Sequence, residues 1–203
     1  SKMKALQPIL EIEEPESAII FVKTKRTASE LTIKLQEAGQ SVDEYHGNLS
    51  QIQRERLVKR FREGKVRTIV ATDIAARGLD VEDLSHVINF DVPDNSETYI
   101  HRIGRTGRAG KTGTAISLIE GYDRRMLKQI ERKIRQTLEV SQIPNRAQVE
   151  AKRLTKLQAQ VKETLAGERM ASFLPLVNEL SGEYDPQAIA AAALQIVYDR
   201  DCP

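Results

Sequence analysis

The residues best suited to chemistry form one run, Tyr99–Lys111, in which cations recur at every third position. Arg102, Arg105, Arg108 and Lys111 share this spacing, and no acidic residue stands between them. On a helical turn the spacing would place like charges side by side, which is unfavourable. The glycines of the run would let the backbone approach a phosphate closely. A guanidinium group can bind two phosphate oxygens at once through two parallel hydrogen bonds. The run therefore predicts a site for a phosphate group, with a solvated basic surface as the alternative.

A second polar group directly follows a predicted strand and contains Thr72, Asp73, Gly78 and Asp80. Asp80 could accept a hydrogen bond from a sugar hydroxyl, and Thr72 could donate one to a phosphate. The two carboxylates could instead serve acid–base hydrolysis or Mg²⁺ binding, and all of these residues could simply cap a loop. The residue types alone leave these alternatives open.

A third polar group, Tyr45–Arg54, follows a weaker strand signal and includes Ser50, a predicted cap for the next helix. The three histidines, His46, His86 and His101, do not have the spacing of metal ligands, and the single cysteine, Cys202, cannot complete a zinc site. No Ser-His-Asp arrangement is visible. We therefore expect no metal site within this chain.

These groups must be positioned by elements that alternate along the first part of the chain. Short apolar runs predict strands at residues 18–22, 42–45, 68–71, 86–90 and 113–119, and amphipathic patterns predict helices at 27–38 and 49–62. Strands that alternate with helices pair into a mainly parallel sheet, and ligands bind at the carboxyl ends of its strands. The chemistry should therefore gather at that edge.

The pattern changes after Gly121, where strand signals end and helical sequence begins at residues 122–138. Ile143–Asn145 indicates a boundary, and Asn145 with Gln148 resembles a capping pair for the helix that follows. Asp185–Pro186 is a strong signal for the start of a further helix. We predict an α/β domain over residues 1–143 and a small all-α domain over residues 144–203. The second is small for an independent core, so its apolar stripes could pair with a second copy, dock on the first domain or stay exposed. We favour self-association.

Composition excludes several classes of protein. The chain carries 31 Lys and Arg against 29 Asp and Glu, so it is neither a polycation nor an acidic tail. Only 4% of the residues are aromatic, which makes RNA binding on stacked aromatic platforms a poor fit. There is no apolar run of membrane-spanning length and no signal segment, and one cysteine favours a reducing compartment. We expect a cytoplasmic protein without a membrane partner.

Taken together, the polar groups resemble the motifs of the carboxy-terminal RecA-like domain of DEAD-box RNA helicases, in superfamily 2. Ile20–Lys25 resembles motif IV, Gln51–Arg54 motif IVa, Val70–Asp80 motif V and His101–Arg108 motif VI. The motifs stand in the family's order and spacing, and the His-Arg opening of motif VI favours the DEAD-box branch. The resemblance implies a RecA-like parallel sheet flanked by helices.

The resemblance also implies roles for matching positions. Arg105 and Arg108 would be catalytic arginine fingers on the ATP γ-phosphate, while Gly78 and Asp80 would hold the ribose. Asp73, His101 and Arg102 would couple the nucleotide site to the RNA and to a partner domain. The remaining positions, which we call the RNA set, would contact the RNA backbone with little sequence specificity: Thr24, Arg26, Gly47, Gln51, Arg54 and Thr72.

The family's Walker A and Asp-Glu-Ala-Asp motifs belong to an amino-terminal RecA-like domain that is absent here, and the Mg²⁺ ligands of the ATP site are expected there. The tail, with Ile143–Arg146 and Glu150–Leu154, resembles the dimerisation region of bacterial cold-shock helicases of the DeaD/CshA type. We therefore expect half of an ATP-dependent RNA helicase, inactive alone and homodimeric through residues 144–203. The alternative is a non-catalytic RNA-binding or dimerising adaptor.

Overall fold

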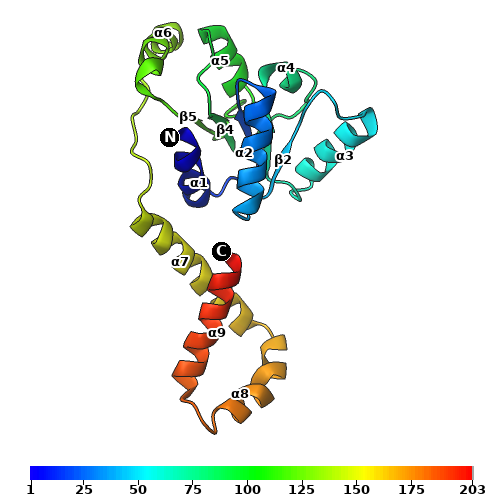
Figure 1. Ribbon diagram of the computed structural model, residues 1–203, viewed down its shortest axis with the longest axis vertical. Helices are drawn as coiled ribbons and strands as arrows, with labels where there is room; N and C mark the ends of the chain where they lie inside the picture. The colour runs from blue at the N-terminus through cyan, green and yellow to red at the C-terminus, as the bar shows by residue number, and fades with distance from the viewer. Residues whose placement is uncertain (203) are drawn as a thin grey trace. The chain divides into compact units, whose positions relative to one another are not determined.

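Residues 1–202 are described by a computed structural model, in which the chain divides into two units with the boundary between Ile143 and Pro144 (Figure 1). Unit 1 precedes this boundary and unit 2 follows it. None of the helices in the described part of the chain is long and apolar enough to span a membrane.

Unit 1 is built on a parallel sheet with the strand order β2-β3-β1-β4-β5. The strands are β1 (Ala18–Phe21), β2 (Val42–Glu44), β3 (Thr68–Ala71), β4 (His86–Asn89) and β5 (Thr114–Ser117). Every residue of β1, β3 and β4 is buried, as expected for central parallel strands covered on both faces. The prediction of an α/β parallel sheet is confirmed.

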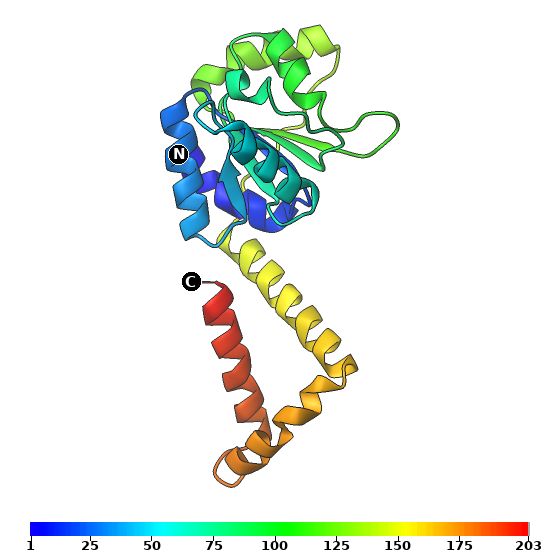
Figure 2. The same cartoon turned by 90° about the vertical axis from the view of Figure 1, so that its right-hand side faces the viewer.

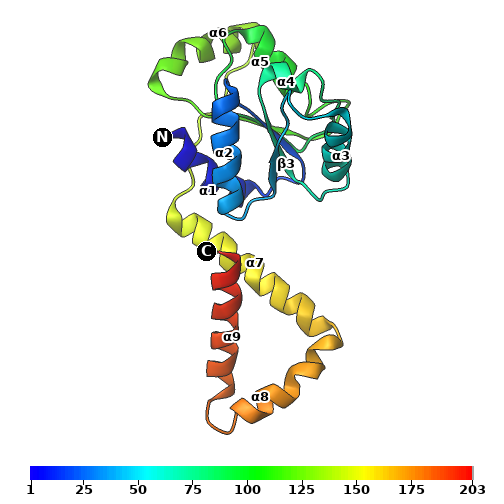
Figure 3. The same ribbon diagram turned by 45° about the vertical axis from the view of Figure 1, so that its right-hand side comes forward.

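Helices cover both faces of this sheet. They are α1 (Lys2–Glu13), α2 (Lys25–Glu37), α3 (Gln51–Arg62), α4 (Asp73–Ala76), α5 (Ser96–Ile103) and α6 (Arg124–Ile134), with a 3-10 turn η1 (Gly121–Asp123) before α6. Because successive strand residues point to opposite faces, Ile20 and Val22 pack in one apolar cluster with side chains of α1 and α2. Ile19 and Phe21 pack in the other, with side chains of α3. Figure 3 shows α1 and α2 on one side of the sheet and α3 on the other.

Side-chain caps fix where three of these helices begin. Thr24, Ser50 and Thr72 follow β1, β2 and β3 in the chain, and each accepts a hydrogen bond from a backbone N–H in the first turn of the next helix. The Thr24 cap makes α2 begin at Lys25, two residues before the predicted start. The caps therefore place three helix N-termini at the carboxyl edge of the sheet.

Several elements differ from the sequence prediction, among them α4 and α5, where no helix was predicted. The helix α1 was not predicted, yet it buries Leu6, Ile9 and Leu10 against the sheet. The helix predicted over residues 122–138 is shorter, since Arg135 takes the left-handed conformation (φ 55°) and ends α6 at Ile134. Both outcomes depend on packing and on local backbone geometry, which hydrophobic spacing does not encode.

Unit 2 consists of helices alone: α7 (Arg146–Ala166), η2 (Arg169–Phe173), α8 (Leu174–Leu180) and α9 (Pro186–Asp201). The predicted capping signals are confirmed, because Asn145 and Gln148 form a capping box on α7 and Asp185 caps α9. The helices form three sides of an open triangle (Figure 2), and a hydrogen bond from the Tyr198 hydroxyl to Glu150 joins α9 to α7. No side chain between residues 144 and 202 is buried.

Candidate functional site

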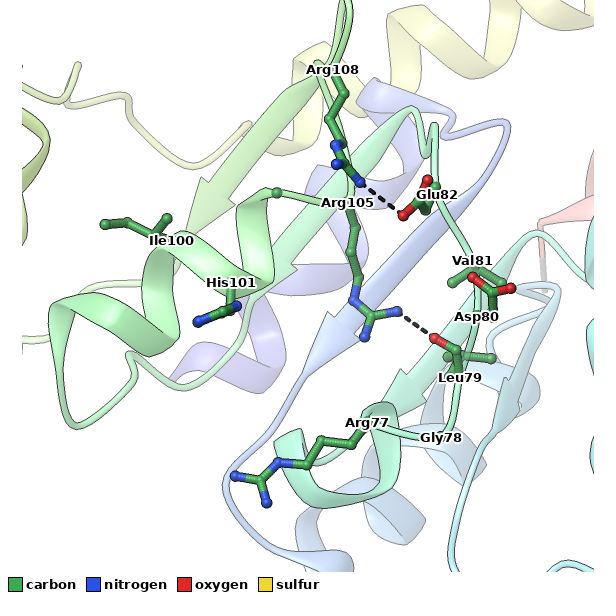
Figure 4. Close-up of a pocket in the computed structure, with 11 residues that line it drawn as sticks. Arg77, Gly78, Leu79, Asp80, Val81, Glu82, Ile100, His101, Arg105 and Arg108 are labelled. Carbon is green, nitrogen blue, oxygen red and sulfur yellow. Dashed lines mark hydrogen bonds and ion pairs between the residues drawn. The ribbon is translucent and has the colours of Figure 1, made fainter.

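A hollow of about 500 Å³ lies between the loop after α4 and the end of α5 (Figure 4). Its walls bring together Gly78, Asp80, His101, Arg105 and Arg108, all of them predicted site residues. They come from two segments far apart in sequence. Gly78 and Asp80 lie in the loop that follows β3 and α4, and the other three lie in α5 or just after it. The size suits a small-molecule ligand.

Arg105 is held at the wall of this hollow by the opposite loop. Its guanidinium donates to the carbonyl oxygens of Leu79 at 2.6 Å and Ala76 at 2.8 Å. Partial burial lowers the pKa of Arg105 below its ordinary value, while the carboxylates of Asp80 and Glu82 act in the opposite direction. An arginine stays protonated in proteins, so its other N–H groups offer the hollow a fixed positive charge.

Arg108 and Lys111 are exposed and ion-paired with the same loop. Arg108 lies 2.8 Å from Glu82, and Lys111 lies 3.1 Å from Asp83. Because each acid lies more than 25 residues before the cation that it pairs with, the run alone does not reveal these partners. Asp83 also has a positive φ of 58°, which costs a non-glycine residue energy.

The turn that carries Arg108 depends on two glycines. Gly107 has a φ of 65°, where glycine is favoured. A Cβ at Gly113 would collide with the Thr106 hydroxyl and the Gly107 nitrogen. Close backbone approach therefore explains these glycines, and the turn presents Arg108 beside the hollow.

Arg102 behaves differently from the other cations of its run, since it is only 3% exposed. It makes a two-pronged contact with Asp73, at 2.8 and 2.7 Å, and also donates to the Asn89 side chain and the Asp91 carbonyl. Its guanidinium lies 5.0 Å from the centre of the Phe21 ring. A solvated basic surface is therefore wrong for Arg102, which links α4, α5 and the sheet within unit 1. His101 points elsewhere, exposed at the hollow.

The RNA set lies along the carboxyl ends of three neighbouring strands. Thr24 and Arg26 follow β1, Thr72 follows β3, and the others follow β2. Because the strand order is β2-β3-β1, the structure brings all six positions to one edge of the sheet. Helix N-termini favour anions, so α2 and α3 add positive potential at this edge.

Several members of the RNA set already have partners within the chain. Arg54 donates to the carbonyls of Gly47 at 2.8 Å and Leu49 at 3.1 Å, and so braces the turn before α3. Arg26 pairs with Glu30 on its own helix at 2.9 Å, in an exposed contact. Tyr45 belongs to the third polar group but had no predicted role; it is buried, and its hydroxyl donates to the Gly78 carbonyl at 3.0 Å. This bond joins the edge of the sheet that carries the RNA set, which we call the RNA edge, to the loop that lines the hollow.

The donor set of the hollow fits one end of a nucleotide. Two guanidinium groups suit phosphate oxygens, and the exposed carboxylate of Asp80 suits a sugar hydroxyl. Between residues 1 and 202 no group of three His, Cys, Asp or Glu side chains is arranged to hold a metal ion. The residues that line the hollow fit contacts to a phosphate and a ribose.

Comparison with known protein families gives two matches. Residues 1–110 match the family described as helicase conserved C-terminal domain, and residues 144–203 match the RNA helicase DeaD dimerization domain. The chain is 74% identical over its full length to RNA helicase CrhR of Synechocystis sp., of which it covers 41%. Over 96% of its length it is 43% identical to ATP-dependent RNA helicase DeaD of Mycobacterium tuberculosis, and over 97% it is 38% identical to CshA of Listeria monocytogenes. It spans 35% and 38% of these two relatives.

Solved structures give the same result for the fold. The C-terminal domain of the DEAD-box protein Dbp5 has a TM-score of 0.61 and 38% identity, over 66% of this chain and 78% of that one. The S. cerevisiae Dbp5 bound to RNA and ADP BeF3 has a TM-score of 0.64 and 36% identity, over 76% of this chain and 41% of that one. The predicted RecA-like fold is confirmed. The chain therefore belongs to the helicase conserved C-terminal domain family of the DEAD-box RNA helicases, and its residues 144–203 belong to the DeaD dimerization domain family.

Proposed function

We propose that unit 1 is the second RecA-like domain of an ATP-dependent RNA helicase and supplies Arg105 and Arg108 to ATP held on an amino-terminal partner domain. The observation that carries the proposal is the hollow whose lining brings Arg105 and Arg108 together with Gly78 and Asp80. Bound ATP would supply the phosphoryl group whose transfer drives the cycle. The chain spans 41% of the length of RNA helicase CrhR, so the rest of the nucleotide site, with the Mg²⁺ ligands, is assigned to that partner domain.

The chain's own residues would do three things. Arg105 would leave one or both loop carbonyls, and Arg108 would leave Glu82, to stabilise negative charge on the phosphate. Arginine fingers of this kind contribute about 10³ to 10⁵ in rate. Asp80 and the Gly78 backbone would fix the ribose. Asp73, His101 and Arg102 would couple these contacts to the RNA edge and to the partner domain.

The RNA set would bind one strand through its phosphates and sugars. Its position along one edge, next to the N-termini of α2 and α3, supports backbone contacts, which carry little sequence information. Closure of the two RecA-like domains around ATP would then distort the bound strand and open a short duplex locally.

Unit 2 would join two copies of the protein. Its match to a dimerization domain and its lack of buried side chains between residues 144 and 202 support this assignment. The division of labour, a helicase domain over residues 1–143 and a dimerisation domain over 144–203, is part of the same proposal. The single cysteine supports a cytoplasmic location.

A comparison of the isolated chain with the full-length protein tests the function. We expect RNA-stimulated ATP hydrolysis from the full-length protein and none from residues 1–203 alone, because the isolated chain lacks the ATP-holding domain. A full-length protein that binds RNA but never hydrolyses ATP would instead favour the adaptor function. Hydrolysis by the isolated chain would contradict the shared active site.

A further inference from the structure

The helix α6 carries four exposed cations on one side: Arg124, Arg125, Lys128 and Arg132. With 3.6 residues per turn, Arg124, Lys128 and Arg132 lie in a row, and the buried Ile130 lies on the opposite side. We call these four cations the α6 basic face. The row extends for about 12 Å, roughly three to four nucleotide steps of a stacked strand.

The four cationic side chains have no partner within the described part of the chain. Among residues 1–202, none of these four side chains makes a hydrogen bond or an ion pair. Each cation of the 102–111 run, by contrast, has a partner. The two acids beside the face in sequence have other partners: Asp123 is buried and pairs with Lys2 at 3.0 Å, and the Glu131 carboxylate accepts a hydrogen bond from the Leu138 backbone N–H. The α6 basic face is therefore an uncompensated patch of positive charge.

The arrangement is unfavourable for the helix itself. Like charges four residues apart repel each other, and cations in the first turn oppose the helix dipole, yet α6 has no acid in its first turn. An anionic ligand would remove both penalties. Packing against the rest of unit 1 explains the apolar residues of α6, but it does not explain the cations on the opposite side.

The chemistry of the face favours a phosphate backbone over a protein. Protein interfaces centre on apolar and aromatic side chains and are depleted in lysine, and none of the exposed large apolar side chains of residues 1–202 lies between 123 and 139. Phosphate contacts need only Arg and Lys on a rigid support. A nucleic-acid backbone is thus the better match.

The location agrees with this ligand. α6 follows β5, so it begins at the same carboxyl edge of the sheet that carries the RNA set at β2, β3 and β1. Figures 1 and 3 show α4, α5 and α6 along this edge of unit 1. We propose that the α6 basic face is a second RNA-binding surface, which holds the phosphate backbone of RNA beyond the segment bound by the RNA set. The proposal rests on the proposed function only in taking RNA as the ligand.

The test uses the full-length protein with the triple substitution Arg124→Gln, Lys128→Gln and Arg132→Gln. The matched control, Lys34→Gln, Lys59→Gln and Arg67→Gln, removes the same charge from exposed cations at the amino-terminal edge of the sheet. Affinity for labelled single-stranded RNA of increasing length is measured at several salt concentrations. Circular dichroism confirms that both variants are folded.

We expect the α6 variant to bind long RNA at least about tenfold more weakly than the control variant. The slope of log K against log salt should be smaller in magnitude by about 2, because three phosphate contacts are lost. Short RNA that occupies only the RNA set should bind equally to both variants. Equal affinity and equal slope for both variants on every RNA would overturn the inference, even if the α6 variant lost binding to an acidic peptide such as polyglutamate. A parent protein with no RNA affinity at all would contradict the proposed function itself.

Discussion

Units 1 and 2 both contain helices with side-chain caps, but they differ in what their helices bury. In unit 1, β1, β3 and β4 are completely buried between helices. In unit 2, large apolar side chains such as Leu165, Phe173 and Ile196 are each more than half exposed. Isolated helices are marginal in water and take most of their stability from a buried apolar face. Caps and apolar stripes therefore suffice to specify where helices form, but they do not by themselves produce a buried core. Unit 2 needs a further apolar surface to complete one.

The largest expected effect comes from removing the same atoms in both units. Ile88→Ala deletes a side chain that is fully buried in the central sheet and should lower the free energy of unfolding by about 3–4 kcal/mol. Ile196→Ala deletes one that is 60% exposed and should change the free energy of unfolding of the dilute chain by less than about 0.5 kcal/mol. Denaturant unfolding of the 203-residue chain at low protein concentration measures both. Equal losses would show that unit 2 has its own core.

A second pair of variants separates two arginines of one run. Arg102→Met leaves Asp73 and the Asn89 amide without their buried partner and should cost about 3 kcal/mol. Arg108→Met removes an exposed ion pair with Glu82 and should cost less than about 1 kcal/mol. Denaturant unfolding of the 203-residue chain measures the free energy lost in each variant. If Arg108→Met were as destabilising as Arg102→Met, the surface pairing of Arg108 would be a structural contact rather than one that can open for a ligand.

The smallest of these effects concerns association. Leu176→Glu places a charge on an apolar side chain of α8 that is 57% exposed, and burying that charge in a dimer would be costly. We expect about 100-fold weaker self-association by sedimentation velocity. Ile33→Glu, at a 55% exposed position of α2, serves as the matched control and should leave association unchanged. A parent chain that sediments as a monomer at all concentrations would contradict dimerisation through unit 2.

Local features were predictable from sequence because their causes are local. The β-branched run at Ala18–Phe21 and the capping signals at Ser50, Asn145 and Asp185 all appear in the structure where the sequence indicates them. The motif residues were also predictable as a set, because a parallel sheet gathers the segments that follow its strands at one edge. Their roles in catalysis and RNA binding stay predictions.

Features that depend on distant contacts were not predictable. The basic run reads as four equivalent cations, yet Asp73 and Asn89 bury Arg102 while Glu82 and Asp83 hold Arg108 and Lys111 at the surface. Only the pairing of β4 with β1 and the course of the loop after α4 determine which acid reaches which cation. The α6 basic face escaped notice for the converse reason, since its significance lies in having no partner within residues 1–202.

The central claim is that Arg105 acts on ATP bound to another domain, and single-turnover ATP hydrolysis at saturating RNA tests it most directly. In the full-length protein, Arg105→Ala should slow hydrolysis about 10³-fold or more while RNA affinity stays within a few-fold of the parent. Arg56→Ala, an exposed arginine of α3, should hydrolyse ATP at the parental rate. Near-parental hydrolysis by Arg105→Ala would contradict the account, because the hollow would then bind its ligand without taking part in the reaction.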